Sequence, residues 1–173
     1  MGVFNKSICD CCACPMQSVL EQLVEPQTQI NVIVTTLGSI SILLGTFTLT
    51  KIKDFIATTS VEIDIAICKI ITVGFQTLPT NFKLKPVRKD IGGECACCED
   101  PMTNLLVGKI GTNISIPSGG GPNGIISAGV KDVGEGIVLL ENIDMGDGIP
   151  ITPFAITSTC LLDAIGPPMT STS

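Results

Sequence analysis

The sequence predicts a mainly β protein made of two tandem small antiparallel β modules, sandwich-like or barrel-like, each preceded by a cysteine cluster and a short helix. Its 173 residues include 24 Ile, 12 Val and 18 Thr, β-branched types that favour strands. Apolar or threonine side chains recur at every second position along much of residues 30–50, which is the period of a strand. A cysteine motif also occurs twice, which indicates a duplicated unit. The alternative is a single jelly-roll β-sandwich with an N-terminal connector.

The repeat aligns without a gap over the cysteine motif. Residues 9–16 read CDCCACPM and residues 95–102 read CACCEDPM. Further on, IKDF at 52–55 matches VKDV at 130–133, and each half then carries one lone cysteine, Cys68 or Cys160. We therefore divide the chain into an N-terminal cysteine connector (1–14), a β module with its leading helix (15–78), a basic, proline-containing linker (79–94), and a second cysteine cluster with its own β module (95–173).

An apolar stripe at helical spacing predicts a helix over residues 15–25. The stripe consists of Met16, Val19, Leu20, Leu23 and Val24. Pro15 fits the first turn of this helix and Pro26 ends it. The matching helix after Pro101 is expected to be shorter, because Gly108 interrupts it.

The rest of each half reads as strands. We expect them in the first half over 29–36, 39–50, 53–59, 61–68 and 70–76. In the second half we expect them over 107–116, 124–131, 136–143, 149–158 and 159–165. The pattern Thr-x-Thr-x-x-Lys-Asp-Phe-Ile at 48–56 is similar to the bent sheet of Sm-like or SH3-like barrels.

The composition excludes several classes of function. Without a single His, the chain cannot supply a Ser-His-Asp triad, a Cys-His dyad or a His metal site. The net charge is −6, and six Phe are the only aromatic residues, so we expect no nucleic-acid partner. We expect no enzyme activity, no catalytic residue and no cofactor.

One charge-free stretch, residues 26–50, is long enough to cross a bilayer. It is rich in Thr and Ser, contains Gly38 and Gly45, and has the period of a strand, so we expect no membrane partner. We also expect no secretory signal before it.

Seven of the nine cysteines lie in the two clusters, and the odd total leaves one without an internal partner. Neighbouring cysteines on an extended chain point to opposite faces, so each doublet is expected to reach two different partners. The candidates for disulfides, including cross-links between subunits, are Cys9, Cys11, Cys12, Cys14, Cys95, Cys97 and Cys98. For Cys68 and Cys160 we expect buried thiols, with a disulfide to a cluster as the alternative.

A thiolate zinc site is the alternative use of the first cluster. Cys11 and Cys14 have zinc-ligand spacing, and Cys9 with Cys12 would complete four thiolates. The second cluster has Asp100 in place of the fourth cysteine, which argues against a shared metal design, so our prediction is no metal site.

The two halves meet in a segment with two prolines and four basic residues, Lys83, Lys85, Arg88 and Lys89. We expect a solvated connector. The alternative is a basic patch that meets the acidic surface of a neighbouring subunit.

The cluster Cys-x-Cys-Cys-x-Cys-Pro-Met before Val-Leu-Glu-Gln-Leu, leading into an Ile/Thr-rich β region, resembles small cysteine-rich proteins of the bacterial spore surface. These include spore coat proteins, exosporium proteins and endospore appendage subunits. The resemblance covers the first 25 residues or so and part of the second cluster.

This resemblance implies a structural subunit that self-assembles into a disulfide-cross-linked fibre or layer on the endospore surface. The partners would be further copies of the chain, as a homo-oligomer or homopolymer, and other spore-surface proteins. By position, Cys9, Cys11, Cys12 and Cys14 would form the connector that bonds to other subunits. The alternative function is a small thiolate zinc-binding protein.

Overall fold

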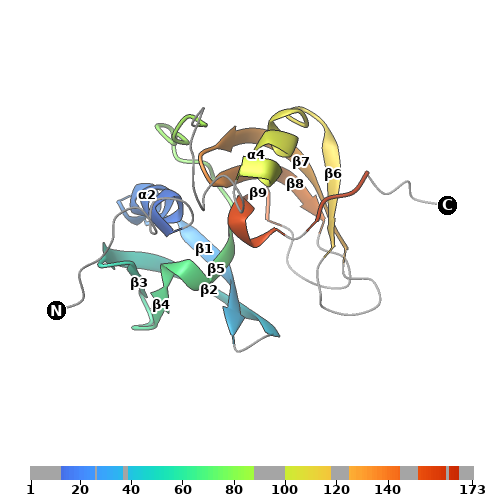
Figure 1. Ribbon diagram of the computed structural model, residues 1–173. Coiled ribbons are helices and arrows are strands. Elements are labelled where there is room, and N and C mark those ends of the chain that lie inside the picture. Colours follow the sequence, from blue (N-terminus) through green and yellow to red (C-terminus); the bar gives the residue numbers. More distant parts are fainter. Residues whose placement is uncertain are drawn as a thin grey trace.

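A computed structural model of the chain describes residues 13–25, 27–36, 39–87, 100–117, 125–144, 152–162 and 164–167. These residues form a mainly β protein in which nine antiparallel strands make one sheet, in the order β4-β3-β2-β1-β5-β9-β8-β7-β6. Two helices accompany the sheet, one for each half of the chain (Figure 1). The predicted fold class is confirmed.

The described residues of the first half form one α-helix, five strands and one 3₁₀ helix. They are α2 (Ala13–Val24), β1 (Gln29–Thr36), β2 (Ser39–Lys53), β3 (Ile56–Thr59), β4 (Asp64–Ala66), η1 (Ile67–Lys69) and β5 (Ile70–Phe75). The second half contains α4 (Asp100–Val107), β6 (Asn113–Pro117), β7 (Ile125–Gly134), β8 (Ile137–Asp144), β9 (Phe154–Ser158) and η2 (Thr159–Leu161).

Most of the predicted elements are present, with differences at turns. The strand expected from residue 107 begins only at Asn113, because α4 runs to Val107 and Gly111, with φ +78°, makes the following turn. The strand expected over 61–68 is shortened to β4, because Glu62 adopts a φ of +61° and η1 follows. The last expected strand, 159–165, is η2 followed by a single bridge between Ser115 and Gly166.

The two halves repeat one fold, and their central hairpins match residue by residue. In the β2–β3 hairpin the register shifts between Leu49 and Lys51. In the β7–β8 hairpin it shifts between Val130 and Asp132, each 81 positions further along the chain. A β-bulge at the same place in both hairpins is a specific feature of a backbone, so we regard the halves as copies of one module. The match of IKDF with VKDV was therefore misaligned by three residues, since Lys53 corresponds to Gly134.

The edge hairpins also correspond. The N–H of Ile67 donates to the carbonyl of Phe55 at 2.9 Å, and the N–H of Thr159 donates to the carbonyl of Gly136 at 3.0 Å. In each module a 3₁₀ turn with a central cysteine follows directly. Equivalent residues of β4 with η1 and of β9 with η2 are 92 positions apart, which makes Cys160 the counterpart of Cys68.

Each module has its own core, and its helix covers that core (Figure 1). Leu20 and Leu23 of α2 are fully buried with the strands of module 1. Leu106 of α4 is fully buried with β6, β7 and β8. Apolar residues on one stripe of a helix drive this packing against a sheet.

The linker is packed against both modules over residues 82–87, and the expectation of a solvated connector was wrong for this part. The side chain of Gln22 both donates to the Lys83 carbonyl at 3.0 Å and accepts from the Lys83 N–H at 2.9 Å. The Glu135 N–H donates to the Lys85 carbonyl at 2.9 Å, and Leu84 packs on the first core. Backbone hydrogen bonds hold the chain, while the side chains of both lysines remain exposed.

Candidate functional site

The two modules are joined strand to strand. β5 of module 1 pairs with β9 of module 2 in the antiparallel register Thr72↔Thr157, Val73↔Ile156, Gly74↔Ala155 and Phe75↔Phe154. The Thr72 and Thr157 hydroxyls are 3.0 Å apart, and the rings of Phe75 and Phe154 stack at 6.1 Å. This junction is heterologous, because β5 lies at one edge of its module and β9 at the opposite edge of the other.

The junction also buries the outer face of the β8–β9 hairpin. Ile137, Leu139 and Ile156 point away from the core of their own module and belong to the core of module 1, with exposures of 3% or less. Residues next to them along the strands, such as Val138 and Ala155, point into the core of module 2. Both faces of this hairpin are therefore buried.

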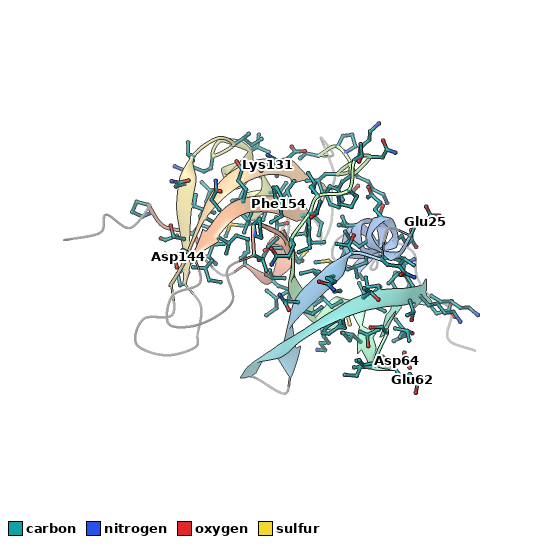
Figure 2. All side chains as sticks on the ribbon, turned by 180° about the vertical axis from the view of Figure 1, so that it is seen from behind. Glu25, Glu62, Asp64, Lys131, Asp144 and Phe154 are labelled. Atoms are coloured by element: carbon teal, nitrogen blue, oxygen red, sulfur yellow. The ribbon has the colours of Figure 1, made fainter. Side chains whose placement is uncertain are left out.

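The equivalent hairpin of module 1, β3–β4, has an exposed outer face. β4 is the last strand of the described sheet at this end. Its Asp64 and the preceding Glu62 are exposed and lie at the opposite end of the molecule from Asp144 (Figure 2). Three large apolar side chains are exposed close by: Ile56 at 36%, Val61 at 58% and Ile63 at 42%. An edge strand with nearby apolar residues is a place where another strand can add.

The other end of the sheet has a partly formed strand. Residues 164–167 follow η2 and join β6 only through the Ser115–Gly166 bridge, with hydrogen bonds of 3.0 and 2.8 Å. Gly166 corresponds to Gly74 of β5, just as Ser115 corresponds to Asn31 of β1, because these two pairs hold the same place in the two modules. The segment 164–167 is therefore the counterpart of β5, and it lies at the far end of the molecule from β4 (Figure 1).

The structure describes three of the nine cysteines. Cys160 in η2 is half-buried and disulfide-bonded, with its partner outside the described residues. Cys68 in η1 is an exposed free thiol. Cys14 lies half-buried in the first turn of α2, so the predicted end of the connector at residue 14 falls inside a helix. The other candidates lie outside the described residues: Cys9, Cys11, Cys12, Cys95, Cys97 and Cys98.

The expectation of a buried thiol was wrong for Cys68. In each 3₁₀ turn the first residue, Ile67 or Thr159, is buried at 1%, whereas the following cysteine is exposed at Cys68 and half-buried at Cys160. Apolar residues on both sides made these segments resemble buried strands. A signal was present in the sequence, since each lone cysteine is followed six residues later by a glycine, Gly74 or Gly166, which aligns the two turns.

The described part of the chain contains no group of three or more Cys, Asp or Glu side chains placed to hold a metal ion. Among its helices, none has the length and apolar character needed to cross a membrane. Comparisons with family models, with curated proteins and with solved structures gave no match.

Proposed function

We propose that this chain is a non-enzymatic structural subunit that assembles with further copies of itself and is cross-linked by disulfides in a fibre or layer on the bacterial endospore surface. The observation that carries the cross-linking is the contrast between Cys68 and Cys160. The two hold the same place in two copies of one module, yet one is in a disulfide and the other is an exposed thiol.

The positions of the two cysteines support different roles for them. Cys160 directly follows β9, the strand that forms the internal junction with β5. Cys68 lies in η1, which directly follows β4, the last strand of the described sheet at this end. Cys68 and a cysteine thiol of a neighbouring copy can be joined as a disulfide beside this edge when dissolved oxygen takes up their two electrons and two protons. The spore-surface location rests on the resemblance of the cysteine motif.

Electrophoresis in SDS with and without a strong reductant tests this function. We expect the oxidised protein to run as a ladder of multiples of 18.0 kDa that collapses to monomer on reduction. Cys68→Ser should shorten the ladder. Cys160→Ser is the matched control: it removes the equivalent cysteine, so it should lower the melting temperature and leave the ladder in place.

Two results would contradict the proposal. Monomer in both lanes would remove cross-linking between subunits from the account. Stoichiometric zinc in the reduced protein, lost when the thiols are alkylated, would support the thiolate zinc-binding function instead.

A further inference from the structure

We infer that β4 of one copy pairs with residues 164–167 of a second copy and so repeats between molecules the β5–β9 junction found within one molecule. The inference rests on the proposed self-assembly and names the two edges that meet. The partner is a second copy of this chain, because each of these edges, which no further strand of the described residues covers, is the module counterpart of a strand already used in the internal junction.

The internal junction predicts the register of the external one. Residues 63–65 correspond to residues 155–157 of β9, and residues 164–167 correspond to residues 72–75 of β5. Transferring the observed pairs gives three predicted pairs between copies: Ile65 with Ala164, Asp64 with Ile165, and Ile63 with Gly166.

The hydrogen-bonding groups needed for this pairing point outward on both edges. Residues of an antiparallel strand bond alternately to one side and the other. The Ile63 carbonyl accepts from the Thr59 N–H within the hairpin, so the N–H and C=O of Asp64 face the open side. Gly166 uses its N–H and C=O on Ser115, so those of Ile165 face the open side. Asp64 and Ile165 can therefore exchange two hydrogen bonds.

The external junction differs from the internal one in its side chains. Asp64 takes the place that Ile156 has at the internal junction, Pro167 takes the place of Phe75, and Glu62 lies in the turn before β4. The external contact therefore buries less apolar surface and depends more on backbone hydrogen bonds. Exposed carboxylates on a short edge strand also keep unpaired copies from aggregating at random. A weak contact of this kind gains permanence from a disulfide beside it, where Cys68 lies.

Because the two edges differ, the contact is head-to-tail. Repetition of such a contact gives a ring where the rotation between copies closes and a filament where it does not. In both cases the modules of successive copies form one row, in which junctions within a molecule alternate with junctions between molecules.

Proline and alanine at position 64 test the pairing. Asp64→Pro removes the outward N–H from a strand edge where proline is tolerated. Asp64→Ala keeps that N–H and is the matched control. In sedimentation of the full chain under reducing conditions, we expect Asp64→Pro to weaken association roughly tenfold or more and Asp64→Ala to preserve it.

The second edge gives an independent test. Ile165→Pro removes the outward N–H of the other partner, and Ile165→Val is its control. Each proline variant keeps one intact edge, so a mixture of Asp64→Pro and Ile165→Pro should form a dimer that grows no further. Circular dichroism and thermal melts of each variant check that both modules remain folded.

The outcomes separate this inference from the proposed function. Wild-type assembly that both proline variants retain unchanged would overturn the edge pairing and leave self-assembly standing by another surface. A wild-type chain that stays monomeric when reduced and when oxidised would overturn both. If Ile165→Pro fails to fold, the comparison of Asp64→Pro with Asp64→Ala still decides.

Discussion

In module 1 the β3–β4 hairpin ends the sheet, whereas in module 2 the equivalent β8–β9 hairpin is covered by its neighbour. Their outer faces differ accordingly. Leu139 and Ile156 of the covered hairpin correspond to Thr58 and Asp64 of the open one, and the Thr58 hydroxyl donates to the Asp64 carboxylate at 2.7 Å. The backbone of the two hairpins is the same. Whether a neighbouring module covers the outer face therefore decides whether these positions carry apolar or polar residues.

The inner faces of the same two hairpins are alike. Ala57 and Ile65 are buried at 0% and 6%, and their counterparts Val138 and Thr157 at 0% and 2%. Each of these inner faces packs on the core of its own module, and both modules need this packing. The shared bulge and register follow from this face, because a slip by one residue would turn it to solvent.

The largest effect should come from giving the covered hairpin the residue of the open one. Ile156→Asp places a carboxylate where the side chain is fully buried in the core of module 1. An unpaired buried charge should lower the free energy of unfolding by about 4 kcal/mol or more. Urea titration followed by circular dichroism measures this loss.

The reverse change is the matched control. Asp64→Ile alters an exposed residue, so the unfolding free energy of the dilute chain should change by less than about 0.5 kcal/mol. A loss below about 1 kcal/mol for Ile156→Asp would mean that the junction between the modules is open in solution.

A smaller effect is expected at the glycine that recurs in both modules. A Cβ on Gly74 would lie 2.7 Å from the Oγ1 and 3.0 Å from the Cγ2 of Thr152, which is buried at 3%. Among the described residues, a Cβ on Gly166 would meet only the Ser115 hydroxyl, at 2.7 Å, and that hydroxyl can rotate. Gly74→Ala should cost about 1–3 kcal/mol by overpacking, and Gly166→Ala should cost less.

The order of these two costs can be measured from thermal melts. Ser115→Ala combined with Gly166→Ala should recover most of the loss at the second site, since the clash involves one atom. If Gly166→Ala lowers the melting temperature more than Gly74→Ala does, the single bridge at 164–167 contributes more to the stability of module 2 than its two hydrogen bonds suggest.

Sequence patterns predicted the elements of this molecule better than their surroundings. The stripe from Met16 to Val24 and the alternation after Gln29 identified α2 and β1 closely, because local periodicity records which side of an element is buried. The outer face of β8–β9 could not be identified, since Leu139 and Ile156 owe their burial to another module. Cys68 was placed wrongly for a similar reason, because its exposure depends on the 3₁₀ turn and on β4 being the last strand of the described sheet.

The two hydrogen bonds between the Gln22 side chain and the Lys83 backbone should have a moderate effect on stability. Gln22→Ala removes two hydrogen bonds to the backbone of Lys83 and should lower the unfolding free energy by about 1 kcal/mol. Lys83→Ala keeps the backbone groups and removes only an exposed side chain, so it should have little effect. Equal losses for the two variants in urea titrations would mean that the Lys83 side chain contributes as much to stability as the two hydrogen bonds from Gln22.

The smallest effect concerns the bulge residue of each hairpin. In module 2 the Lys131 ammonium is 2.7 Å from the Glu141 carboxylate and 5.7 Å from the centre of the Phe154 ring at the junction. In module 1 the positions of Lys131 and Glu141 are occupied by Thr50 and Ser60. Among the described residues, no junction like β5–β9 lies beside them. Lys131→Met should cost about 0.5 kcal/mol, because both partners are partly exposed and water screens them.

Salt separates the two contributions of Lys131. The ion pair should be largely screened in 1 M NaCl, so most of the difference between wild type and Lys131→Met should vanish there. Lys53→Met is the control, since the Lys53–Asp54 contact is longer, at 3.8 Å, and well exposed. Because methionine keeps most of the aliphatic stem, a loss for Lys131→Met that persists at high salt would place its value in the contact of the ammonium with the Phe154 ring, and would make Lys131 part of the junction between β9 and β5.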